Sequence, residues 1–91
     1  MSGPSQAVRL LHLEDAELDH ALVMAQLRRA GLAVDAVRIE TRAEFARALG
    51  ARWDVIVSDY NLPGFSGLEA LQMLRDSGAV VPFILVSGEI G

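Results

Sequence analysis

Residues 54–69 read DVIVSDYNLPGFSGLE, and this stretch decides the fold. Its first part, residues 54–58, centres on three consecutive β-branched residues, which is typical of a strand that is buried on both faces. Ser66 and Glu69 then have the spacing of a capping box, so we expect a helix that begins here and continues to about Ser77. A buried strand that leads into a helix is the repeating unit of an α/β fold.

The same alternation extends along the chain in both directions. Apolar runs predict further strands at residues 8–13, 34–39 and 82–87, and helical spacing of apolar residues predicts a helix at about 17–30. Thr41 and Glu44 form a second capping box, whose helix runs to about Leu49. This order of elements predicts a doubly wound parallel sheet with helices on both faces. We expect one domain, residues 1–91, with four strands and three helices.

The composition narrows the class of protein. The chain has 91 residues, 52% hydrophobic and 22% charged, which favours a globular, soluble protein. No apolar run approaches the roughly 18 residues of a membrane span, and residues 1–6 lack the features of a secretory signal. There is no cysteine, and the net charge of −4 argues against a nucleic-acid surface. We therefore expect a cytoplasmic protein with neither nucleic acid nor membrane as a partner of this segment.

Acidic and hydroxyl side chains follow three of the predicted strands. Glu14 and Asp15 come after the first strand, Asp59 after the third and Ser87 at the end of the fourth. In doubly wound sheets, ligands bind at the carboxyl ends of the strands. If the first and third strands are neighbours, about 4.8 Å apart, Asp15 and Asp59 converge on one crevice.

Converging carboxylates need a proton or a cation between them. Two unit charges about 4 Å apart repel by about 4 kcal/mol at an effective dielectric constant of about 20. Hard oxygen ligands in an open crevice suit Mg²⁺, which keeps several of its waters. Such an ion would also hold a phosphoryl group, and an aspartate carboxylate is itself a competent nucleophile for phosphoryl transfer. Ser87 would then donate a hydrogen bond to a phosphoryl oxygen.

Each of these residues also has a simpler interpretation. A single aspartate after a strand is more often a turn or capping residue, and Glu14 with Asp15 would suit the first turn of a helix. Ser87 and Gly88 would form only a turn. Because all of these residues fall at the same predicted sheet edge, we favour a shared function over independent local roles.

These motifs together resemble the receiver domains of two-component response regulators, the CheY-like family. The segment from Leu11 to Asp15 resembles the first strand and acidic pair of the family. Residues 59–67 resemble its phosphoacceptor segment, with a proline four residues and a glycine eight residues after the aspartate. Residues 82–88 resemble its fourth strand and switch hydroxyl, so the resemblance spans nearly the whole chain.

The resemblance implies a role for each matching residue. Asp59 would accept the phosphoryl group from a histidine kinase, a phosphotransfer protein or a small phosphodonor. Asp15, Asp59 and the backbone carbonyl of Asn61 would ligate Mg²⁺, with Glu14 acting through a metal-bound water. Ser87 would report phosphorylation. Pro63 and Gly67 would shape the loop, Gly67 through its freedom at positive φ. Such a domain assists its own phosphotransfer and dephosphorylation and is not an enzyme with a separate substrate.

The chain also departs from the family pattern. A receiver has strands in the flavodoxin-like order 2-1-3-4-5, and its fifth strand ends in a lysine. Here all eight cations are arginines, and the sequence printed stops before a fourth helix, fifth strand and fifth helix. We therefore expect a chain truncated after the fourth strand, with slower phosphorylation because a stabilising cation is missing.

Two alternatives to a working phosphoacceptor are open at this stage. The first is a phosphorylation-impaired interaction module of receiver fold, which forms a homodimer or domain swap through its exposed fourth strand, residues 83–86. The second is a metal-dependent phosphatase of Rossmann-like fold. Those enzymes carry a second acid two residues after the nucleophilic aspartate of the first strand, and residues 13–15 lack that spacing.

Overall fold

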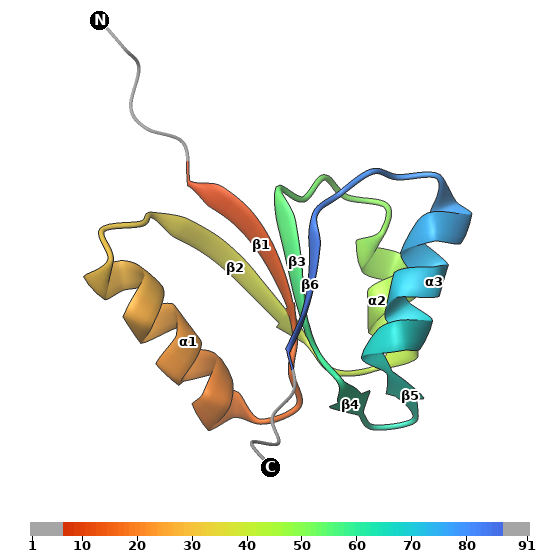
Figure 1. Ribbon diagram of the computed structural model, residues 1–91, viewed down its shortest axis with the longest axis horizontal. Coiled ribbons are helices and arrows are strands. Elements are labelled where there is room, and N and C mark those ends of the chain that lie inside the picture. Colours follow the sequence, from red (N-terminus) through yellow and green to blue (C-terminus); the bar gives the residue numbers. More distant parts are fainter. Residues whose placement is uncertain (1–6, 87–91) are drawn as a thin grey trace, which may run out of the picture.

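A computed structural model describes residues 7–86 of the protein and shows one twisted parallel sheet between helices (Figure 1). Its strand order is β2-β1-β3-β6, and every pairing in this sheet is parallel. The strands are β1 (Val8–Leu13), β2 (Val34–Ile39), β3 (Val55–Asp59) and β6 (Phe83–Val86). The sequence-based predictions of a parallel α/β sheet and of adjacent first and third strands are therefore confirmed.

The helices lie on both faces of the sheet, as expected (Figure 1). Helix α1 (Glu17–Arg29) covers the β2 side of one face, whereas α2 (Arg42–Ala48) and α3 (Gly67–Ser77) pack on the other face. This arrangement follows from the crossover connections, because parallel strands are joined by helices that return over the sheet. Among residues 7–86, no helix combines the length and the apolar character that crossing a bilayer requires.

The hydrophobic core lies between the sheet and the pair α2 and α3. Because side chains alternate along a strand, one set of strand residues points to this side. The fully buried members include Leu11, Leu13 and Ile56 from the strands and Phe45 from α2. Phe83 of β6 packs against the same cluster. Packing in this core holds the carboxyl ends of β1 and β3 side by side, and so it positions the residues that follow these strands.

The predicted capping boxes are both present. The Thr41 hydroxyl accepts a hydrogen bond from the Glu44 N–H at 3.1 Å, and the Ser66 hydroxyl accepts one from Glu69 at 3.2 Å. In each box the glutamate side chain accepts in return from the backbone N–H of the capping residue. These reciprocal bonds satisfy donors that a helix start otherwise leaves free, so they explain where α2 and α3 begin.

The α1 side of the sheet is covered much less completely. Helix α1 has no buried residue, and Leu18 on its surface is 72% exposed. Val55 and Val57 of β3 are only partly buried, whereas Ile56 on the opposite face is fully buried. The expectation that this strand is buried on both faces is therefore met on one face only.

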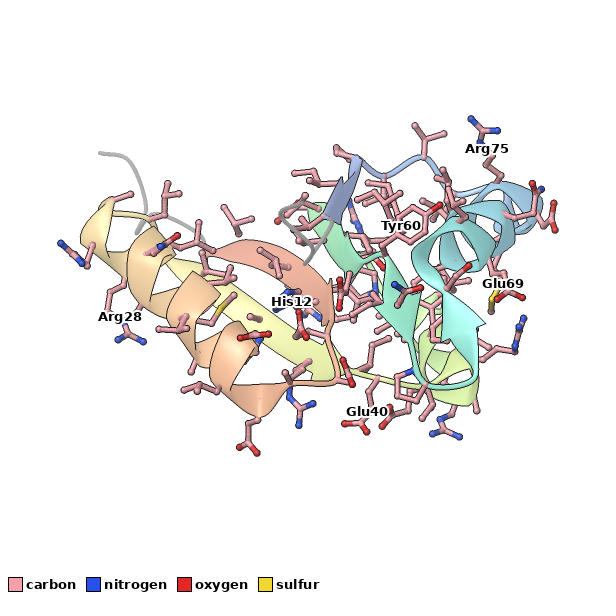
Figure 2. The ribbon with its side chains drawn as sticks, turned by 60° about the horizontal axis from the view of Figure 1, so that its bottom comes forward. His12, Arg28, Glu40, Tyr60, Glu69 and Arg75 are labelled. Atoms are coloured by element: carbon pink, nitrogen blue, oxygen red, sulfur yellow. The ribbon has the colours of Figure 1, made fainter. Side chains whose placement is uncertain are left out.

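A histidine pair joins α1 to the sheet. The Nδ1 atoms of His12 on β1 and His20 on α1 are 2.8 Å apart, a hydrogen-bond distance that requires one ring nitrogen to be protonated and the other not. His12 is 3% exposed and lies on the α1 side of the sheet (Figure 2). Burial, followed by the charges of His20 and Arg38, lowers the pKa of His12 from 6.5 to about 4. Burial also lowers the pKa of His20.

This pair predicts a loss of stability in mild acid. The unfolded chain takes up a proton on His12 near pH 6.5, whereas the folded chain takes it up only near pH 4. The contribution of neutral His12 to the free energy of unfolding is therefore complete above pH 6.5. It is lost as the pH falls toward 4, by an amount on the order of 2 kcal/mol. Urea unfolding across this range should show a shallower decline for His12→Asn than for wild type. Equal declines for both proteins would contradict this origin.

Candidate metal and phosphoryl-transfer site

Three carboxylates meet where β1 and β3 end. Oxygens of Glu14, Asp15 and Asp59 all lie within 4.8 Å of one another, and we call these residues the acidic cluster. The cause is the strand register, because Leu13 pairs with Ser58 and the residues that follow leave adjacent strands at the same level. The predicted convergence of Asp15 and Asp59 is therefore confirmed.

Glu14 is the most firmly held member of the acidic cluster. Its side chain is buried, its backbone N–H donates to the Ile39 carbonyl at 3.0 Å, and its Oε2 accepts from the Ala16 N–H at 3.1 Å. Its own carbonyl accepts from Nη1 of Arg38 at 3.1 Å. The first acid after β1 is thus fixed through both its backbone and its side chain.

The electrostatics of the acidic cluster favour a cation. Burial raises the pKa of Glu14, and the charges of Asp59, Asp19 and Asp15 raise it further, while the Ala16 N–H acts in the opposite direction. A raised pKa means that the surroundings of the carboxyl group destabilise its ionised form. A divalent cation would remove this penalty, and an all-oxygen donor set with access to water is the kind that Mg²⁺ accepts.

Asp59 is held at the end of β3 and remains partly accessible. Its Oδ1 accepts a hydrogen bond from the Tyr60 N–H at 2.8 Å, and the same N–H lies 3.0 Å from the carbonyl oxygen of Val86 on β6. These contacts orient the carboxylate toward the rim where Glu14 and Asp15 lie. An oriented, half-buried carboxylate beside a cation site has the placement that a nucleophile for phosphoryl transfer needs.

A short β-hairpin, which was not predicted from the sequence, follows Asp59. Strand β4 (Asn61–Leu62) pairs with β5 (Phe65–Ser66), and Pro63 and Gly64 form the turn, with Gly64 at φ 76°. Proline followed by a glycine at positive φ is the signature of a type II turn. Leu62 and Phe65 are buried in the core and anchor the hairpin. The expected shaping role of Pro63 fits this turn, and a metal-binding role for the Asn61 carbonyl stays a prediction.

The prediction that Gly67 is needed for its freedom at positive φ was wrong. Among the described residues, only Gly31, Gly64 and Gly78 have positive φ. Gly67 is instead required by close packing, because a Cβ at this position would lie 2.6 Å from the Asp59 carbonyl oxygen and would also clash with Leu85. Its N–H donates to the Tyr60 carbonyl at 2.8 Å. The start of α3 therefore rests directly against the backbone of the candidate nucleophile.

One predicted site residue lies beyond the described part of the chain, and one residue beside the site was not predicted. Ser87, the expected switch hydroxyl, lies outside the described residues. Arg38 was not predicted from the sequence, because nothing in the spacing of the eight arginines indicates which one binds the Glu14 carbonyl. The available signal was its place on β2 opposite His12, near the carboxyl end of the sheet.

The tight contact at Gly67 predicts a specific sensitivity to a single methyl group. Gly67→Ala should lower the free energy of unfolding by about 1–3 kcal/mol, since the added Cβ must displace backbone at Asp59. Gly50→Ala is the matched control, because its Cβ would meet only an ordinary contact at 3.5 Å. Urea denaturation of both variants measures the difference. A Gly67→Ala protein as stable as the control would show that the approach is not tight.

The comparisons with known proteins agree with this geometry. The sequence model of a family described as the response regulator receiver domain matches residues 10–90. Two-component response regulator ORR41 of Oryza sativa subsp. japonica is 28% identical over 85 residues, which cover 90% of this chain and 67% of that protein. ORR6 of the same plant is 29% identical over 86 residues, which cover 90% of this chain and 51% of that protein.

A solved structure shows the same fold. The receiver domain of sensor histidine kinase PA1611 from Pseudomonas aeruginosa PAO1, with a magnesium ion coordinated in its active site cleft, superposes with a TM-score of 0.74. It is 26% identical, over 88% of this chain and 66% of that one. The chain thus spans between 48% and 72% of the length of such relatives and similar structures.

Proposed function

Because the chain belongs to the family of response regulator receiver domains, we propose that it is a phosphoacceptor switch in which Asp59 receives a phosphoryl group. The observation that carries this proposal is the acidic cluster, three carboxylates from two β–α junctions within 4.8 Å of one another. Receiver domains are signalling domains, so the expected product is a modified domain that a partner reads. The phosphodonor would be a histidine kinase, a phosphotransfer protein or a small phosphorylated compound.

The donor set supports Mg²⁺ as the cofactor. Asp15 and Asp59 would bind it directly, together with the carbonyl of Asn61, and Glu14 would act through a bound water. When bound, the ion would supply the positive charge that offsets both the carboxylates and the phosphoryl oxygens. The magnesium described for the PA1611 receiver lies in the cleft of a similar fold, which supports the same assignment here.

The proposed step is the transfer of a phosphoryl group from the donor to Asp59. An Asp59 carboxylate oxygen attacks the phosphorus, the bond from phosphorus to the donor nitrogen or oxygen breaks, and the donor keeps the electron pair. A nitrogen donor also takes up a proton, whereas a carboxylate donor leaves as the anion. The product is an acyl phosphate on Asp59. Tyr60 contributes its N–H, which orients the carboxylate before attack. Ser87 would then donate its hydroxyl to a phosphoryl oxygen.

Charge neutralisation at this site depends heavily on the metal. The chain contains no lysine, and the guanidinium of Arg38 is already bound to the Glu14 carbonyl and to Glu40 at 3.0 Å. The metal ion would therefore supply much of the positive charge that stabilises the transferred phosphoryl group.

A second candidate function rests on the outer edge of β6. Within residues 7–86, no strand pairs with this edge, and Ile84 and Val86, which point to the α1 side of the sheet, are 51% and 45% exposed. Exposed apolar edges of this kind pair with other chains. The alternative is therefore an interaction module of receiver fold that forms a homodimer or domain swap through β6 and is phosphorylated poorly.

One labelling experiment separates these functions. The purified protein is incubated with acetyl phosphate and Mg²⁺, and its intact mass is measured beside Asp59→Asn and Asp35→Asn. Asp35 is a matched control, an exposed aspartate at the start of β2 and so at the opposite rim. We expect one phosphoryl group on wild type and on Asp35→Asn, and none on Asp59→Asn.

The other outcomes are equally informative. An Asp59→Asn protein that is labelled like wild type would overturn the proposed phosphoacceptor. A wild-type protein that stays unlabelled with excess Mg²⁺, yet sediments as a dimer, would favour the interaction module.

A further inference from the structure

The loop that carries Glu14 and Asp15 has little apolar packing to hold it in place. It leads into α1, whose side chains are exposed or only partly buried, and Ala16 at the start of α1 provides no side-chain cap. In contrast, α3 begins with a capping box against the core and buries Leu74. The position of the two acids must therefore come from polar contacts rather than from the packing of the helix that follows.

Strand β2 supplies two such polar contacts, one to the backbone N–H of Glu14 and one to its carbonyl oxygen. The Glu14 N–H donates to the Ile39 carbonyl at 3.0 Å, and the Glu14 carbonyl accepts from Nη1 of Arg38 at 3.1 Å. The first bond continues the pairing of β1 with β2. The second is made by a side chain, so it depends on the residue type at position 38.

Arg38 is itself held in this orientation. Its Nη1 also lies 3.0 Å from Oε2 of Glu40, which stands just beyond the end of β2 (Figure 2). The arginine side chain is 26% exposed, so its contacts are partly shielded from water. Strand register places Arg38 beside His12, and its charge lowers the pKa of both His12 and His20. Arg38 therefore joins the loop to β2 and lies next to His12 in the sheet.

We infer that Arg38 is a positioning residue for the metal site, which fixes the Glu14–Asp15 loop by binding the Glu14 carbonyl. This inference rests on the proposed function, since it assigns Arg38 to the same Mg²⁺ site. The geometry favours positioning over direct charge compensation, because the guanidinium contacts a backbone oxygen and Glu40, not a carboxylate of the acidic cluster. Outer contacts that orient metal ligands commonly change metal affinity about tenfold or more.

The test is a Mg²⁺ titration followed by amide chemical shifts in NMR spectra. Arg38→Ala should raise the Mg²⁺ Kd about tenfold, because the loop then samples positions in which its carboxylates are apart. Arg38→Lys keeps a donor and should recover part of the affinity. Arg75→Ala is the matched control: it removes the same kind of side chain at an exposed position in the last turn of α3, away from the acidic cluster, so its Kd should stay within about twofold of wild type.

A second readout separates positioning from general damage. At saturating Mg²⁺, acetyl-phosphate labelling of Arg38→Ala should reach a maximal rate close to that of wild type, because excess metal restores the ordered loop. An unchanged Kd in Arg38→Ala, or a maximal rate that falls while Kd stays constant, would overturn the inference. If wild type binds Mg²⁺ but is never labelled, the proposed function fails, and the Kd comparison still decides the role of Arg38.

Discussion

The site depends on one constraint: β1 and β3 are parallel neighbours that end at the same level. Pairing of Leu13 with Ser58 brings the residues after both strands to one rim, and their carboxylates are forced together. Burial, followed by repulsion from the neighbouring carboxylates, raises the pKa of Glu14, so the ionised acidic cluster destabilises the fold. A bound cation would offset this repulsion. The same strand register therefore accounts both for the close carboxylates and for the proposed metal site.

The rim is built from two unequal halves. On the β3 side, the hairpin and α3 are anchored in the core, and Gly67 allows α3 to rest against the Asp59 backbone. On the β1 side, the loop leads into a helix without buried side chains, and polar links through Arg38, His12 and His20 replace apolar packing. The candidate nucleophile is therefore on the half that is anchored in the core, while Glu14 and Asp15, the other two acids of the proposed metal site, depend more on hydrogen bonds.

Much of this architecture could be predicted from the sequence, because it follows from local rules. β-Branched runs indicated the strands, and the Thr41 and Ser66 capping boxes marked two helix starts that the structure confirms. What could not be predicted depends on distances between segments. The close approach at Gly67, the pairing of His12 with His20 and the reach of Arg38 to Glu14 leave no periodic pattern. The role of Ser87 stays a prediction.

The most direct measurement asks whether one ion contacts both junctions. Mn²⁺ replaces Mg²⁺ at oxygen sites and broadens the NMR signals of nearby amides. Substoichiometric Mn²⁺ should broaden the amides of residues 14–16 and 59–61 together, and excess Mg²⁺ should restore both sets. Broadening that affects only one of the two segments, or that appears elsewhere first, would contradict a shared cation at this rim.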